Sequence, residues 1–199
     1  MSRISLRKAR TRKAMLRVFL RWFLYAALLV FFYVCECDPI IRGYCPLILI
    51  PLATAAAMHE GDLAAGIFGA LCGLMLDMAN GVTVLGFSAL WLLAACPFIS
   101  LLSRFFVKSN LLSHFIMNAA VVVVMAGLDM LFLHWVWEGA DSVISFQRVI
   151  LPSYSGAILF SIPVYLLVHL ISSKLRPREQ QRLDESAQSA EELEEIERD

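Results

Sequence analysis

Two carboxylates lie in stretches of the chain that are otherwise almost free of charge. Asp77 is the only formally charged residue among the 41 residues from Leu63 to Ser103, and Asp129 lies within the apolar run VVVVMAGLDMLFLHWVW. An acid in such a segment can relay a proton, contact a ligand or partner, or accept hydrogen bonds from neighbouring helices. A relay needs more ionisable groups than these, so we expect internal hydrogen bonding or a ligand or partner contact.

The remaining polar residues suggest helix contacts rather than catalysis. We expect Asp77, Asn118 or His134 to accompany Asp129, although His134 lies about 140° round the helix from it. The sequence contains no CxxC pair, no HExxH and no nucleophile–base arrangement, so we predict no catalytic residue, no metal site and no cofactor. A disulfide among Cys35, Cys37 and Cys45 stays open, because it depends on whether that side of the membrane is oxidising.

Small residues lead up to Asp77 at helical spacing. Gly69, Gly73, Asp77 and Gly81 repeat every four positions, and each step turns the helix by about 400°, so neighbours differ by only about 40°. Gly66 lies beside this face. Because small residues let a second backbone approach closely, we predict that this face packs against another helix and that Asp77 points into the contact.

Two interpretations of Asp77 stay open. In the first, Asn80 and Gly81 end one helix, and the next helix begins near Thr83 or Val84. Its first N–H groups would then bond the carboxylate and brace a helical hairpin. In the second, the carboxylate is a polar contact for a partner or ligand.

The composition indicates the elements that must position these residues. Of the 199 residues, 59% are hydrophobic, and long runs lack any charge. Since a bilayer core needs about 20 apolar residues per helix, we predict an all-α integral membrane protein with a six-helix transmembrane bundle. The predicted helices are 18–35, 45–59, 63–80, 84–103, 112–136 and 149–173. The second contains Pro46 and Pro51, and at 15 residues it spans only about 22 Å.

The charges gather at the two ends of the chain. Eight of the 17 basic residues precede residue 22, and nine of the 17 acids follow Arg178. We therefore predict a basic arm at 1–17, a transmembrane domain at 18–173 and an acidic tail at 174–199. The positive-inside bias places both termini in the cytoplasm, with the arm on anionic lipid and no role in binding nucleic acid. The tail is either solvated or a contact for a basic partner.

The central sequence resembles one known family. The run GIFGALCGLMLDMANGVTVLGFSALWLLAACPFISLL is similar to the core of the rod shape-determining protein MreD family. That family's pattern is a glycine-rich helix ending in G-L-x-x-D, a short turn, and L-G-x-x-A-L at the start of the next helix. The pattern matches Gly73 and Asp77 and then Gly86, which the resemblance makes the motif residues. A looser similarity covers residues 18–172.

The resemblance implies a non-enzymatic protein of the bacterial inner membrane, with a fold similar to the substrate-binding components of energy-coupling-factor transporters. Its expected partners are an MreC-type bitopic membrane protein, the actin-like MreB, a SEDS glycosyltransferase and a class B penicillin-binding protein. Its expected role is to support lateral peptidoglycan synthesis and cell shape. The basic arm, the acidic tail and the Cys35-Glu36-Cys37 loop depart from the family.

A different class of function stays open. The chain could be the small-molecule-binding subunit of a vitamin transporter, in which Asp77, Asp129 and nearby aromatic residues contact the ligand. Such subunits usually carry an A-x-x-x-A face on the first helix. Here Val30 and Phe31 stand where the second alanine would be. We therefore prefer the scaffold.

Overall fold

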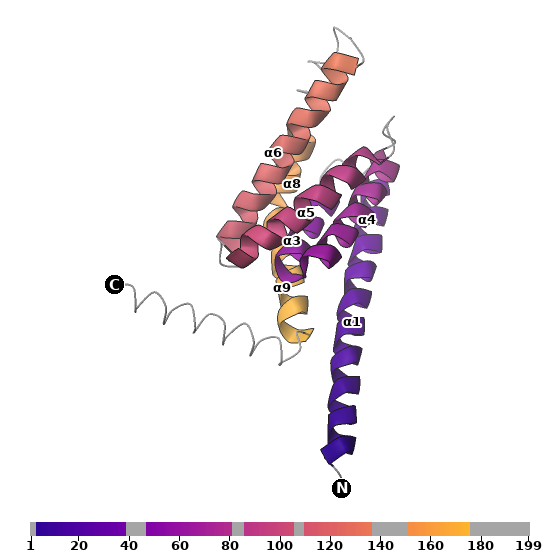
Figure 1. Ribbon diagram of the computed structural model, residues 1–199. Helices are drawn as coiled ribbons and strands as arrows, with labels where there is room; N and C mark the ends of the chain where they lie inside the picture. Colours follow the sequence, from indigo (N-terminus) through magenta and orange to yellow (C-terminus); the bar gives the residue numbers. More distant parts are fainter. Residues whose placement is uncertain (1–2, 39–46, 81–85, 106–109, 137–150, 176–199) are drawn as a thin grey trace, which may run out of the picture. The chain divides into compact units, whose positions relative to one another are not determined.

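The computed structural model describes residues 3–38, 47–80, 86–105, 110–136 and 151–175. Helices form nearly all of them (Figure 1), and no strand occurs within these ranges. The helices are α1 (Arg3–Cys37), α3 (Leu49–His59), α4 (Asp62–Asn80), α5 (Phe87–Phe105), α6 (Leu111–Val136), α8 (Leu151–Leu159) and α9 (Ser161–Leu175). The predicted all-helical class is confirmed.

The chain divides into two compact units. The larger unit, Ala27–His169, contains the end of α1, all of α3 to α8, and α9 up to His169. The smaller unit joins the two ends of the chain, Met1–Ala26 and Leu170–Asp199. Asp77, Asp129 and the glycine face therefore all belong to the larger unit.

The short helix α3 is the centre of the larger unit. It contacts α4, α5, α6 and α8, and every residue from Leu49 to Met58 is buried. Pro51 lies in its first turn, where a backbone N–H has no partner within the helix, so the proline costs little there. At 11 residues, α3 is about 16 Å long, which is too short to cross a bilayer core of about 30 Å.

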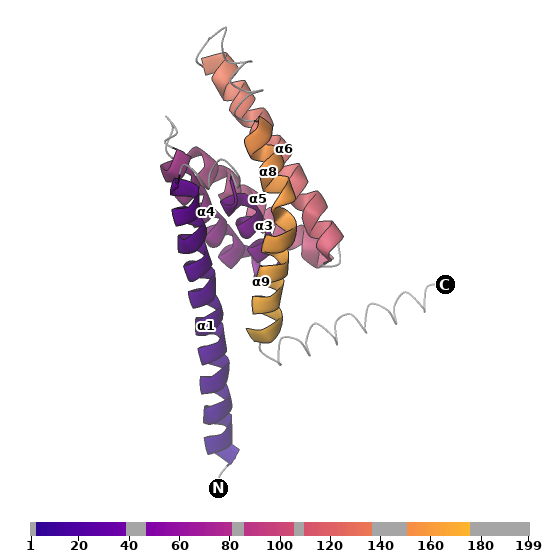
Figure 2. The ribbon, with the colours of Figure 1, turned by 180° about the vertical axis from the view of Figure 1, so that it is seen from behind.

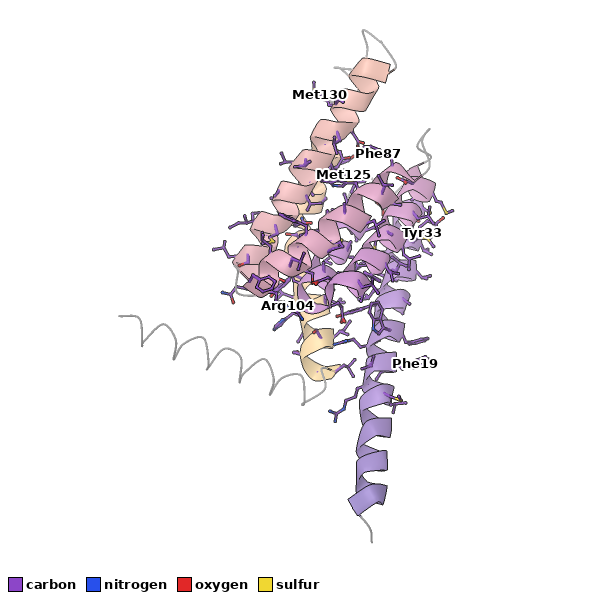
Figure 3. The ribbon with its side chains drawn as sticks, in the orientation of Figure 1. Phe19, Tyr33, Phe87, Arg104, Met125 and Met130 are labelled. Carbon is purple, nitrogen blue, oxygen red and sulfur yellow. The ribbon has the colours of Figure 1, made fainter. Side chains whose placement is uncertain are left out.

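Four of the described helices are long and apolar enough to cross a membrane. Their candidate spans are Met15–Cys37, Asp62–Ala79, Phe87–Phe105 and Leu111–Leu131, and α8 with α9 make a fifth if the bent pair is one span. Side chains such as Phe19 and Met130 are exposed to the surroundings, whereas Met125 is buried (Figure 3). This pattern indicates a multi-pass membrane protein. The predicted six spans are not shown, because α3 is an interior helix.

The last apolar segment is broken, where the sequence analysis predicts one helix at 149–173. Helix α8 ends at Leu159, α9 begins at Ser161, and their axes differ by 43° (Figure 2). Pro163 explains the break, because a proline removes one helical hydrogen bond and its ring collides with the carbonyl four residues earlier, that of Leu159.

The predicted basic arm is helical in its described part. Helix α1 begins at Arg3 and continues without interruption into the apolar span that starts at Met15. Its 35 residues correspond to a length of about 52 Å. The segment that precedes the span is therefore an extension of the same helix rather than a separate element.

Candidate functional site

The face of α4 that carries the glycines packs directly against α5, as Figure 1 shows for the two helices. A Cβ atom built on Gly73 would lie 2.5 Å from the Ala89 Cα, and one on Gly69 would lie 2.8 Å from the Leu92 carbonyl oxygen. Both distances are shorter than real Cβ contacts, so only glycine permits this approach of the two backbones.

Gly66 makes room for the proline of the neighbouring helix. A Cβ atom at Gly66 would lie 2.9 Å from the Pro97 Cγ and 3.5 Å from the Leu93 carbonyl oxygen. Pro97 lies inside α5 and cannot donate to the carbonyl of Leu93, four residues earlier. The glycine spacing that predicts a helix contact therefore lies at the contact between α4 and α5.

Asp77 joins the end of α4 to the beginning of α5. The Gly86 N–H donates to Asp77 Oδ2 at 2.8 Å, and the Ser88 N–H donates to Asp77 Oδ1 at 3.3 Å. Its side chain is only 1% exposed. The first N–H groups of a helix lack partners within the helix, and a carboxylate there also matches the helix dipole. Of the two interpretations, the bracing one is what these hydrogen bonds show.

Gly86 allows the chain to enter α5 at this position. Its φ is +97°, a conformation that is strained for residues with a Cβ. The predicted start of the next helix near Val84 is early, since α5 begins at Phe87. Gly81, the last member of the predicted glycine face, lies outside the described residues, as does the side chain of Asn80.

Asp129 bonds a residue that the sequence analysis did not pair with it. The Tyr154 hydroxyl, on α8, donates to Asp129 Oδ2 on α6. Asp77 is close enough for its charge to act on both Asp129 and Tyr154. Of the expected company of Asp129, Asn118 bonds elsewhere, and a direct contact with Asp77 stays a prediction. His134 lies on α6, and its side chain is outside the described residues.

Asn118 belongs to a buried polar cluster at the centre of the larger unit. Thr54 Oγ1, on α3, lies 3.0 Å from Asn118 Oδ1 and 3.2 Å from His114 Nε2, both on α6. The Asn118 side-chain amide donates to the Ala157 carbonyl of α8 at 3.4 Å. All three polar side chains are buried. The cluster therefore fastens α6 and α8 to the central helix.

The hydroxyl of Thr54 has one proton and two acceptors within reach, Asn118 Oδ1 at 3.0 Å and the Pro51 carbonyl at 3.2 Å. If the hydroxyl donates to Asn118, it can only accept from His114. His114 then carries its proton on Nε2. In that arrangement His114 donates to Thr54, Thr54 donates to Asn118, and Asn118 donates to the Ala157 carbonyl.

Aromatic and imidazole rings continue from this cluster along α9. The rings of His114 and Tyr165 stack with centroids 4.8 Å apart, and Tyr165 stacks on His169 at 5.7 Å. His59, in the last turn of α3, contacts both Tyr165 and His169, at 5.7 and 5.4 Å. His114 and Asn118 are one turn apart on α6, Tyr165 and His169 are one turn apart on α9, and both pairs are thus parts of one contact region between α3, α6 and α9.

Several polar residues of these contacts were missed by the sequence reasoning. Thr54 and Tyr154 carry no local signal, since their partners lie 60 and 25 residues away in the chain. Glu36, near the end of α1, is buried and acts electrostatically on Cys72. The only available sign of Glu36 was its place next to an apolar run, where an acid is unusual.

The polar contacts described above join separate segments of the chain. The described residues contain no group of three or more histidine, cysteine or acidic side chains that could hold a metal ion. Cys35, Cys37, Cys72 and Cys96 are free thiols, and Cys45 lies outside the described residues. Asp77, Asp129 and the buried amide of Asn118 are hydrogen-bonded to other segments of the chain.

Comparisons with models of protein families, with curated proteins and with solved structures find no match. The fold itself defines the class: a multi-pass helical membrane protein with a helical hairpin whose second helix is capped by an acid of the first.

Proposed function

We propose that this protein is a non-enzymatic membrane scaffold of the bacterial cell-elongation complex, of the MreD type. The observation that carries the proposal is the α4–α5 hairpin. Gly73, Asp77 and Gly86 are the residues that match the MreD pattern. The Gly86 N–H donates to the Asp77 carboxylate and so joins the two helices. In this proposal the protein resides in the bacterial inner membrane, with both termini in the cytoplasm.

A braced hairpin suits a scaffold because it presents a fixed surface to another helix. The hairpin also exposes large apolar side chains in the part that would lie in the membrane: Leu63, Ile67, Leu71, Leu90 and Phe98. A partner's single span can pack on such a surface by dispersion contacts, which drive helix association in lipid. We propose that the span of an MreC-type protein docks here and that MreB, a SEDS glycosyltransferase and a class B penicillin-binding protein join the same complex.

Co-purification tests this proposal. A tagged copy of the full chain, solubilised from bacterial membranes, is expected to recover an MreC-type bitopic protein. The double variant Ile67→Ala with Leu71→Ala changes exposed positions of α4, so it should lower partner recovery several-fold without lowering protein yield. The matched control is Leu112→Ala with Ile116→Ala on α6, which removes similar exposed groups. Loss of the partner only in the control would place the docking surface on α6.

A small-molecule-binding transporter subunit is the second candidate. The hydrogen-bonded pair of Asp129 and Tyr154, with Asp77 nearby, favours it because a few polar groups among apolar helices can orient a ligand. Recovery of paired ATPases in the same co-purification, in place of the bitopic protein, would support this candidate and overturn the scaffold.

A further inference from the structure

The basic residues of α1 are not spread evenly around the helix. At about 100° per residue, positions 3, 7, 10 and 17 all fall within about 40° of position 21. Each of these five positions is an arginine. Lys8 and Arg12 fall about 140° and 180° away, on the opposite side of the same helix. We call Arg3, Arg7, Arg10 and Arg17 the arginine stripe; Arg21, at the end of the same face, is buried and already has an interaction within the described residues.

The arginine stripe continues a face that is buried further along α1. Arg21 is 5% exposed, and Tyr25, one turn later, is fully buried. On the other side of the helix, Leu16, Phe19 and Phe23 are exposed. Because α1 is uninterrupted, the helical spacing places positions 3, 7, 10 and 17 on the same side of the helix as Arg21, and Arg17 itself is exposed.

An acidic segment of the same chain begins close to this region. Residues 179–199 contain nine acids and two arginines, whereas the first 35 residues contain eight basic residues and no acid. The two ends of the chain, Met1–Ala26 and Leu170–Asp199, fall in one unit, and the acidic segment starts four residues after the end of α9 at Leu175. The acidic segment is therefore joined by a short tether to the unit that contains the basic part of α1.

We propose that the arginine stripe of α1 is the docking surface for the chain's own acidic segment, residues 179–199. The contact would rest on charge complementarity along one helix face. A single exposed ion pair is weak, but a short tether keeps the acidic segment at an effective concentration of the order of mM. Several weak pairs formed together can then hold the segment. The contact would cover the arginines and keep them from anionic lipid or from an acidic partner until the segment is displaced.

Photo-crosslinking in the full chain tests the proposal. Leu193, inside the acidic run, is replaced by benzoylphenylalanine, and single copies of the protein are placed in nanodiscs of neutral lipid. Irradiation followed by mass spectrometry should find intrachain crosslinks to residues 3–17. Their yield should fall several-fold when the salt is raised from about 0.05 M to about 0.5 M, because salt screens exposed charges.

Two double variants with equal loss of charge test which face of α1 binds the acidic segment. Arg7→Gln with Arg10→Gln lies on the stripe and should reduce the crosslink several-fold. Lys8→Gln with Arg12→Gln lies on the opposite side and should leave it within about twofold of the parent, because exposed pairs contribute only when close. Equal loss in both variants, or no crosslink in the parent, would overturn the proposal. A crosslink that vanishes when about a third of the lipid is anionic would assign the stripe to lipid instead.

Discussion

The α4–α5 hairpin and the contacts of α6 hold helices together in different ways. In the hairpin, the backbones meet across glycines, and the carboxylate of Asp77 bonds backbone N–H groups. Helix α6 instead meets α3 and α8 through side chains, with Thr54, Asn118 and Tyr154 as the bonding partners. Gly127, on α6, has no atom within 4 Å of the position that a Cβ would take.

This difference teaches where the molecule can tolerate change. A backbone-to-backbone contact leaves no side chain that could move aside, so added volume must separate the helices. A side-chain contact can adjust through rotamers, and its loss costs about the value of its hydrogen bonds. We therefore expect the hairpin to be the more sensitive region, and the predictions below test that order.

Gly73→Ala should cause the largest loss of stability. The added Cβ would lie 2.5 Å from both the Ala89 Cα and the Ser88 carbonyl oxygen, so α5 must move away. We expect a loss of at least about 1–3 kcal/mol in the free energy of unfolding, as is typical of overpacking. The melting temperature of the purified protein should drop clearly. Gly127→Ala is the matched control. It should be neutral or stabilise by up to about 1 kcal/mol, because alanine is the better helix former. Equal melting temperatures for the two variants would contradict the close packing of the hairpin.

Asp77→Leu should be the next most harmful change. It removes the acceptor of the Gly86 and Ser88 N–H groups, at a total cost of about 1–3 kcal/mol, because only the Ser88 bond is fully buried. Asp77→Asn keeps one carbonyl acceptor and should lose about half as much. Thermal unfolding in detergent measures both, and a drop in yield should accompany the leucine variant. Should the leucine variant melt like the parent, the cap would not brace the hairpin.

The hairpin was also the region that the sequence revealed best. Its signal is local, because Gly66, Gly69, Gly73 and Asp77 lie within four turns of one helix and their partner helix follows immediately. The capping bond to Gly86 spans nine residues. The last span was predicted as one helix at 149–173, in which Pro163 indicates a kink or a helix start, and the sequence alone does not show which of the two occurs.

The contacts of α6 could not be predicted in the same way. Thr54 and Asn118 are 64 residues apart, and only the folded chain brings them together. The interior position of α3 is equally non-local: its apolar residues suit lipid and protein surroundings alike, and its short length was the single indication. Asp129 was recognised as an unusual acid, but its partner Tyr154 lies 25 residues further along the chain and carries no local signal.

Thr54→Val should have a smaller effect than the changes in the hairpin. Valine has the shape of threonine but removes the hydroxyl that lies between His114 and Asn118. The buried amide and imidazole then lose a partner, at a cost of about 1–3 kcal/mol. Thr54→Ser keeps the hydroxyl and should cost about 1 kcal/mol for the lost methyl group. If serine and valine destabilise equally, packing of α3 rather than the hydrogen bonds would hold α6 in place.

Tyr154→Phe should have the smallest effect of the four. It removes one hydrogen bond, and Asp129 is only partly buried, so water or lipid headgroups can replace the lost donor. We expect a cost of about 0.5–1.5 kcal/mol, or up to about 3 kcal/mol if the bond behaves as a charged one. A double-mutant cycle with Asp129→Asn separates the two cases, because the coupling energy reports the bond itself. A coupling larger than the whole effect of Asp77→Leu would reverse the order of the two regions, and would make the α6–α8 contact the more sensitive one.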